Sequence, residues 1–255
     1  MSRRMVLTAL EGIPTIAPGD DLVPLIVAGM NGMGLAPEDG DVLVLAQKIV
    51  SKAEGRSIRL GDVVASPAAV ELAARANKDP RVVELMLQES VEVLRCRPGV
   101  IIVQHRSGLV MANAGIDASN VDGADGDERV LLLPEDSDRS AAALRESFRS
   151  VVGRDIGIVI ADSFGRAWRN GTVGTAIGLA GPPGLWDMRG LRDRNGRVLR
   201  ATEVAIADEL AAAASLLMGQ AAENLPVVHV RGFPLALRPS SVKELIRDRN
   251  IDLFR

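Results

Sequence analysis

At 255 residues, the chain is long enough to bury a large core as one domain or as two unequal lobes that share a site. Its 47% hydrophobic and 25% charged residues are typical of a globular protein, and no apolar run approaches the length of a transmembrane helix. The net charge of -3 argues against a general nucleic-acid binder, and the single cysteine, Cys96, excludes an internal disulfide. We therefore expect one catalytic unit over residues 1–255, in a reducing cytoplasm and independent of membranes.

The first fifty residues predict a loop, a helix and a buried strand in that order. Turn-forming residues fill positions 12–21, and the apolar periodic segment from Leu22 to Met30 favours a helix. Val42 to Ala46 is a continuous apolar run that predicts a buried strand. Because the polar run Gln47 to Arg56 follows at once, we expect these polar residues to lie at a strand exit.

A pair of helices and a hairpin are predicted next. Ser66 and Pro67 combine a capping serine with proline at the first helical position, which favours a helix towards Asn77, and Pro80 separates it from a second. The apolar runs at 99–104 and 109–113 then flank a short turn, which is the spacing of a β-hairpin.

The central part of the chain predicts a strand, a helix and a strand, at about 130–133, 140–152 and 156–161. Residues 165–200 are rich in glycine and arginine and contain the strong turn Asn195-Gly196. We expect this segment to form an inserted lobe or an active-site flap.

The last part predicts a long helix at about 202–218, a strand at 227–230 and a short helix after Pro239. Helices and strands alternate along the chain, but the hairpin signal argues against a purely parallel sheet. The predicted fold class is therefore α/β (mixed α+β), with helices packed on a mixed sheet.

Several common catalytic motifs are absent from the sequence. The chain has no Walker loop, no dinucleotide-binding glycine fingerprint after a strand, and no serine-hydrolase elbow. His105 and His229 have no cysteine or histidine neighbour at metal-ligand spacing, so we expect structural roles for both and no zinc site.

Charged residues at predicted strand ends are the remaining candidates for chemistry. Asp117 and Asp162 each follow an apolar strand, where carboxylates can ligate Mg2+ or Mn2+ together with substrate phosphates. Taken alone, either aspartate is more often a turn or helix cap. Lys48 and Lys52 are two of only four lysines among 30 Lys and Arg residues. Their spacing fits either a chemical role or a solvated turn.

Five stretches of the chain, taken in order, resemble the coenzyme F420:γ-glutamyl ligase family. They are Gly12–Ile16, Ser51–Arg56, Asn113–Asn120, Asp162–Arg166 and Met218–Gln220. The resemblance covers almost the whole chain. It implies a GTP-dependent ligase that joins L-glutamate to the deazaflavin coenzyme F420-0 through an acyl phosphate and can then add further γ-linked glutamates. It also implies an intertwined homodimer.

The resemblance further implies which residues form the site. The loop Ile13, Pro14, Thr15, Ile16 and the residues Gln47, Lys52, Asn120, Gly219 and Gln220 would bind the co-substrate GTP. Two Mg2+ or Mn2+ ions would bind at Asp117, Asp162, Ser163 and Gln220, the first ion at the two aspartates and the second at Ser163 and Gln220. Gln47 stands where a small hydroxyl residue is typical of the family, and Ser163 where threonine is.

We add two arginines on chemical grounds, because a guanidinium can hold a carboxylate or phosphate through two hydrogen bonds. Arg166 is a candidate catalytic residue with Asp117 and Asp162, and Arg169 is a second candidate; a solvated loop is the alternative for both. Two other functions also fit the sequence. One is a metal- and nucleotide-dependent amide ligase for a different acid, and the other is a nucleotide-binding module without turnover.

Overall fold

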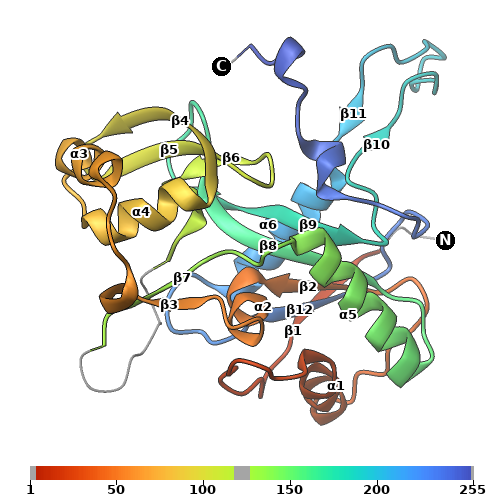
Figure 1. The fold of residues 1–255 in the computed structure, drawn as a ribbon. Coiled ribbons are helices and arrows are strands. Elements are labelled where there is room, and N and C mark those ends of the chain that lie inside the picture. The colour runs from red at the N-terminus through yellow and green to blue at the C-terminus, as the bar shows by residue number, and fades with distance from the viewer. Residues whose placement is uncertain (1–3, 118–126, 254–255) are drawn as a thin grey trace.

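A five-stranded mixed sheet forms the centre of the protein. The computed structural model describes residues 4–117 and 127–253 (Figure 1). In the sheet order β1-β12-β2-β8-β9, the inner strands β2 and β8 are parallel and every other pair is antiparallel. The strands are β1 (Val6–Ala9), β2 (Val42–Ala46), β8 (Gly157–Gly165), β9 (Thr172–Ala180) and β12 (Val227–Arg231). The prediction of a mixed sheet with helices is thus confirmed.

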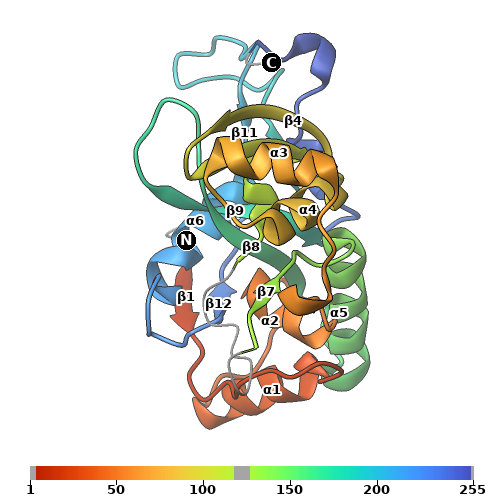
Figure 2. The same cartoon turned by 60° about the vertical axis from the view of Figure 1, so that its left-hand side comes forward.

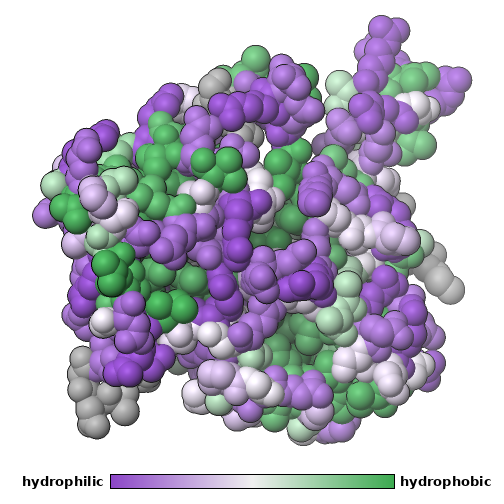
Figure 3. Space-filling view, viewed as in Figure 1, coloured by the Kyte–Doolittle hydropathy of each residue, from purple (hydrophilic) through white to green (hydrophobic). Residues whose placement is uncertain are grey.

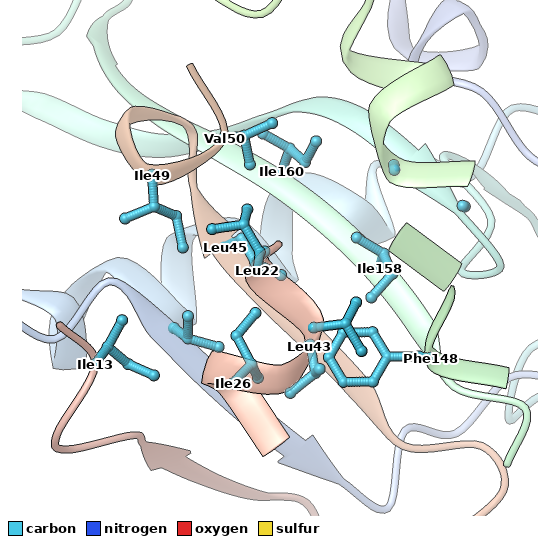
Figure 4. Close-up of a cluster of buried hydrophobic side chains, with 14 of the residues drawn as sticks. Ile13, Leu22, Ile26, Leu43, Leu45, Ile49, Val50, Phe148, Ile158 and Ile160 are labelled. Carbon is cyan, nitrogen blue, oxygen red and sulfur yellow. The ribbon is translucent and has the colours of Figure 1, made fainter. Parts of the chain in front are cut away.

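Helices cover both faces of this sheet because its strands are apolar on both sides. Along β2, Leu43 and Leu45 face one layer, which contains α1 (Leu22–Gly32) and α5 (Ser137–Val152). Figure 4 shows this cluster, with the ring of Phe148 beside Leu43. The alternate residues of β2, Val42 and Val44, pack with α6 (Ile206–Met218) on the other face. The result is a helix–sheet–helix sandwich.

Most of these helices are capped at their N-termini by a side chain of the preceding loop. Asp21 accepts a hydrogen bond from the backbone N–H of Val23 at the start of α1, and Asp136 caps α5 in the same way. Ser66 and Asp79 cap α3 (Pro67–Ala76) and α4 (Pro80–Gln88), and each helix has proline in its first turn. The two predicted helices after residue 66 are therefore confirmed.

A smaller lobe is built from α3, α4 and a three-stranded sheet, at the upper left of Figure 1. Its strands are β4 (Ser90–Arg97), β5 (Val100–His105) and β6 (Val110–Ala112), and they confirm the predicted hairpin while adding the unpredicted β4. β3 (Ser57–Arg59) and β7 (Arg129–Leu131) form a two-stranded sheet, and Figure 2 shows β7 below the smaller lobe and beside the helix that follows β2.

The segment 165–200 differs from the expected lobe, because its first half is the strand β9 of the central sheet. Two of its glycines are required by close packing. A Cβ atom at Gly174 would lie 2.3 Å from the carbonyl oxygen of Ala211 in α6, and one at Gly178 would lie 2.4 Å from that of Ser137 in α5. These glycines let helices approach the strand and do not indicate a flexible flap.

Residues 186–204, hereafter the arm, project from the body of the protein (Figure 1). The arm begins and ends with the paired strands β10 (Trp186–Asp187) and β11 (Glu203–Val204). It is mainly hydrophilic and stands clear at the upper right of Figure 3. Leu191 and Val198 are exposed on it, each at 48%.

Shorter elements complete the fold. The polar run after β2 forms a helix, α2 (Gln47–Ala53), where we expected only a strand exit. The short 3-10 helices are Leu60–Asp62, Asn113–Gly115, Val242–Leu245 and Arg249–Ile251, and the third is the helix predicted after Pro239. Within residues 4–117 and 127–253, no helix is both long enough and apolar enough to cross a membrane.

Candidate functional site

A cavity of about 560 Å³ lies where the two parallel strands of the central sheet end. Strand β2 ends at Ala46, which pairs with Ala161, while β8 continues through Asp162 and Ser163. The open edge beyond the carboxyl ends of parallel strands is a common place for a ligand site. Other walls of the cavity come from the loop at 14–16, from Asp117 and from the segment that follows α6.

Helix α2 brings two lysines to this cavity because it begins directly after β2. Lys48 and Lys52 lie one helical turn apart, and both line the cavity. Gln47 is 1% exposed, and its side-chain oxygen accepts a hydrogen bond of 2.8 Å from the Ser51 hydroxyl. The side-chain carbonyl oxygen of Gln47 therefore already accepts a hydrogen bond from within α2.

A sharp turn at the end of β6 delivers Asp117. Asn113, Ala114 and Gly115 have successive φ values of 54°, 55° and 67°, a left-handed conformation that alanine rarely adopts. The side chain of Asn113 accepts a hydrogen bond from the backbone N–H of Ile101 at 3.1 Å and holds the turn against β5. Two backbone hydrogen bonds with Leu131 then fix Asp117 beside β7.

The two candidate metal-binding aspartates share their surroundings with Lys48. The ammonium nitrogen of Lys48 lies 2.5 Å from a carboxylate oxygen of Asp117. Burial raises the pKa of Asp162 to about 6; the N–H of Ser163 lowers this pKa, the charge of Asp117 raises it and that of Lys48 lowers it. Asp117, Asp162 and Lys48 thus form one electrostatic group.

The segment after α6 closes another side of the cavity. Gly219 ends the helix with φ 73° and ψ -175°. Beyond it, the side-chain nitrogen of Gln220 donates a hydrogen bond of 3.0 Å to the Ser163 hydroxyl. The carboxylate of Glu223 accepts a hydrogen bond from the N–H of Ala221 at 2.8 Å, which lowers the pKa of Glu223. The first contact holds the segment against β8, and the second stabilises a turn within the segment.

Two isoleucines anchor the loop at 13–16. Ile13 and Ile16 are 3% and 5% exposed and belong to the core that contains α1, as Figure 4 shows for Ile13. Pro14 and Thr15 lie between them, are exposed, and line the cavity with Ile16. The core therefore fixes both ends of a short loop whose middle faces the ligand space.

Most of the predicted site residues come together in this cavity. Those that line it are Pro14, Thr15, Ile16, Gln47, Lys52, Asp117, Asp162, Ser163, Gly219 and Gln220. Ile13 does not line it because its side chain is in the core. Asn120 lies outside the described residues.

Arg166 and Arg169 do not line the cavity. Both are exposed in the loop between β8 and β9, where Arg166 donates a hydrogen bond to the carbonyl of Gly171 at 3.2 Å. The structure also adds residues that we did not predict: Ser215, Glu223 and Asn224 line the cavity. The sequence did not indicate these residues, because they belong to no motif. The end of α6 and the segment after it bring them to the cavity.

The donors in the cavity fit a hard divalent cation. Asp117 and Asp162 offer carboxylate oxygens, and Ser163 and Gln220 offer a hydroxyl and an amide oxygen. Among the described residues, no three histidine, cysteine or acidic side chains lie close enough to enclose a metal by themselves. A cation held here would therefore complete its shell with water or phosphate oxygens, as Mg2+ commonly does.

Both histidines lie away from the cavity, as expected for structural residues. His229 is 2% exposed, and its Nε2 lies 2.8 Å from the carboxylate of Asp41 at the opposite end of β2. His105 is equally buried and hydrogen-bonded to the hydroxyl of Ser107. The chemistry of the cavity therefore rests on carboxylates, lysines, hydroxyls and amides.

Such a site defines a class of protein: a mixed-sheet α/β protein suited to binding a phosphate-bearing ligand together with a divalent cation. The comparisons with known proteins identify its family. Residues 12–232 match the family described as F420-0:Gamma-glutamyl ligase. The chain belongs to this family.

Named relatives resemble the chain over nearly its full length. It is 46% identical to the coenzyme F420:L-glutamate ligase of Methanothermobacter thermautotrophicus, over 98% of each chain. It is also 46% identical to that of Methanopyrus kandleri, over 96% of this chain and 97% of the relative. It is 41% identical to that of Archaeoglobus fulgidus, over 99% and 97% respectively.

Proposed function

We propose that this protein is a GTP-dependent ligase that joins L-glutamate to coenzyme F420-0 through an amide bond. Membership of the family and the names of the relatives support the substrates. The observation that carries the proposal is the cavity, which gathers the loop at 14–16, Lys52, Asp117, Asp162 and Gln220 from distant parts of the chain. A further cycle on the newly added glutamate would extend a γ-linked tail.

Each group of residues has a separate task in this proposal. Thr15 and Lys52, on two walls of the cavity, suit the phosphates of GTP, because a hydroxyl can donate a hydrogen bond and an ammonium adds a positive charge. Asp117 and Asp162 would hold one divalent cation, and Ser163 and Gln220 a second. When bound, Mg2+ or Mn2+ neutralises phosphate oxygens and orients them.

The chemical steps are two displacements. First, a carboxylate oxygen of the coenzyme attacks the γ-phosphorus of GTP, and the bond from that phosphorus to the bridging oxygen breaks to give an acyl phosphate and GDP. The amine of glutamate then attacks the acyl carbon, phosphate leaves, and the nitrogen loses a proton to solvent. No protein nucleophile is needed, so positioning and charge neutralisation are the tasks of the cavity.

The proposal also includes a homodimer that acts in the cytoplasm. The arm supports the dimer, because Leu191 and Val198 are apolar side chains exposed on a segment that projects from the body of the protein. Light scattering at micromolar concentration should give the mass of two chains. A monomeric mass would contradict the dimer while leaving the ligase proposal intact.

The direct experiment is mass spectrometry of F420-0 incubated with the protein, glutamate, Mn2+ and GTP. Omission of each component in turn, and replacement of GTP by ATP, are the controls. We expect glutamylated coenzyme and GDP only in the complete mixture. Turnover of a different carboxylic acid in place of F420-0 would favour another amide ligase, and nucleotide binding without turnover of any acid would favour a non-catalytic module.

A further inference from the structure

Three charged side chains meet on one wall of the cavity. Lys48 and Asp117 form an ion pair of 2.5 Å with side-chain exposures of 34% and 26%. Asp162 lines the same cavity as this ion pair, and the charges of Asp117 and Lys48 shift its pKa in opposite directions. Lys48 comes from α2, Asp117 from the turn after β6, and Asp162 from β8, so three separate elements have to converge for this group to form.

This group contains two acidic side chains and one basic side chain. Two carboxylates that line the same partly buried space repel, and one ammonium offsets that repulsion in part. A divalent cation between the same carboxylates would offset both charges. Ammonium and metal ion would then repel each other across a few ångströms, so the two cations compete for the same oxygens.

We propose that Lys48 is a built-in counter-ion for Asp117 and Asp162, which a divalent cation displaces when it binds. This inference rests on the metal site of the proposed function and extends it to a residue that the family resemblance did not include. The long side chain of Lys48 lets its ammonium swing away while its backbone stays in α2. The displaced ammonium remains in a cavity built for an anion, where phosphate oxygens are its natural partners.

Lys52 provides a matched comparison on the same helix. It lines the same cavity one turn later, but the ion pairs of the described residues do not join it to Asp117 or Asp162. A general effect of positive charge would involve both lysines similarly. If Lys48 is the counter-ion of the two aspartates, removing its charge should change the affinity for a divalent cation, and removing the charge of Lys52 should change that affinity much less or not at all.

The test is direct titration of nucleotide-free protein with Mn2+, followed by the electron paramagnetic resonance signal of unbound Mn2+. Lys48→Met removes the charge and keeps most of the length of the side chain, Lys48→Arg keeps the charge, and Lys52→Met is the control. We expect the dissociation constant of Lys48→Met for Mn2+ to be roughly tenfold lower than that of the unmodified protein. A tenfold change has the same free energy as a shift of about one pKa unit, which is a common size for the effect of one neighbouring charge. Lys48→Arg and Lys52→Met should bind Mn2+ nearly as the unmodified protein does.

Tighter Mn2+ binding by the variant is diagnostic. If Lys48 only supported the structure of the site, its removal would weaken Mn2+ binding. Unchanged or weaker Mn2+ binding by a folded Lys48→Met protein would overturn the proposal, as would equal tightening in Lys52→Met. If Lys48→Met does not fold, Lys48→Gln tests the same loss of charge. Absence of Mn2+ binding in every protein, including the unmodified one, would overturn the metal site itself and this inference with it.

Discussion

The side chain of Gln220 donates a hydrogen bond of 3.0 Å to the hydroxyl of Ser163. This contact joins the segment after α6 to the end of β8, and both residues line the cavity. It places the two proposed ligands of the second cation in contact with each other. The pair therefore offers a way to perturb the site without disturbing the core.

Replacing Ser163 with alanine should lower the rate of ligation by tenfold or more, roughly what loss of one hydrogen bond to a charged group costs. The melting temperature should change little, because the Gln220 contact is exposed. Ser163→Thr keeps the hydroxyl and is the matched control, which should retain most of the activity. Equal loss in the two variants would indicate that size, and not the hydroxyl, matters at this position.

Gly115 should be much harder to replace than another glycine of similar conformation. It has φ 67°, and a Cβ atom there would lie 2.9 Å from Leu133, so Gly115→Ala combines backbone strain with a steric clash. We expect a loss of about 3 kcal/mol in the free energy of unfolding. Gly153→Ala, at φ 68° in open space, should cost only about 1 kcal/mol. Chemical denaturation of both variants measures the difference, and equal losses would remove the clash from the explanation.

Asp41 should stabilise the protein at neutral pH and lose this effect in acid. Burial alone would raise its pKa, but hydrogen bonds from His229 and Arg231 bring the pKa well below its ordinary value. Because the folded-state pKa is depressed, the stabilisation is present above the unfolded value of about 3.9 and is lost as the pH falls below it. Asp41→Asn should cost about 3 kcal/mol at pH 7, the scale for breaking a buried ion pair.

Denaturation of the unmodified protein and Asp41→Asn at several pH values checks this expectation. The difference in unfolding free energy between them should be constant from neutral pH down to about 4 and should shrink at lower pH. A difference that stays constant through the acid range would mean that Asp41 contributes shape and not charge.

Much of the fold could be predicted from the sequence where local signals agree with the packing. Ser66 with Pro67, and Asp79 with Pro80, mark helix starts by chemistry that acts within a few residues. Apolar runs such as Val42–Ala46 predicted strands, and the hairpin signal at 99–113 argued against a purely parallel sheet. Strand β4 was missed because irregularities in its register disturb the alternation that reveals a strand.

The rest depended on contacts between distant segments. The glycine-rich composition of residues 165–200 suggested an inserted lobe or an active-site flap. Gly174 and Gly178 instead each permit a helix to approach β9, and only the packed structure reveals this. Likewise, the spacing of Lys48 and Lys52 left a chemical role and a solvated turn equally open. It could not indicate that Lys48 reaches Asp117, since that pairing is set by the turn at Asn113 to Gly115.

Asp117 and Asp162 should act as a unit in the reaction. Asp117→Asn and Asp162→Asn should each abolish detectable ligation, and the double variant should be no worse, since residues that hold one ion are not additive. Each single variant should melt within a few degrees of the unmodified protein, because neutralising one carboxylate relieves repulsion at the metal-free site and leaves the other to balance the charge of Lys48. Substantial ligation by either single variant would exclude a shared cation.

The central claim is that GTP activates the carboxylate of F420-0 for attack by glutamate. The most direct measurement uses coenzyme whose acceptor carboxylate is labelled with a heavy oxygen isotope, incubated with the protein, GTP, glutamate and Mn2+. The account predicts that, as the glutamyl amide forms, one labelled oxygen per amide appears in the released phosphate, because the acyl phosphate transfers that oxygen to phosphorus. Amide formation with unlabelled phosphate would contradict it.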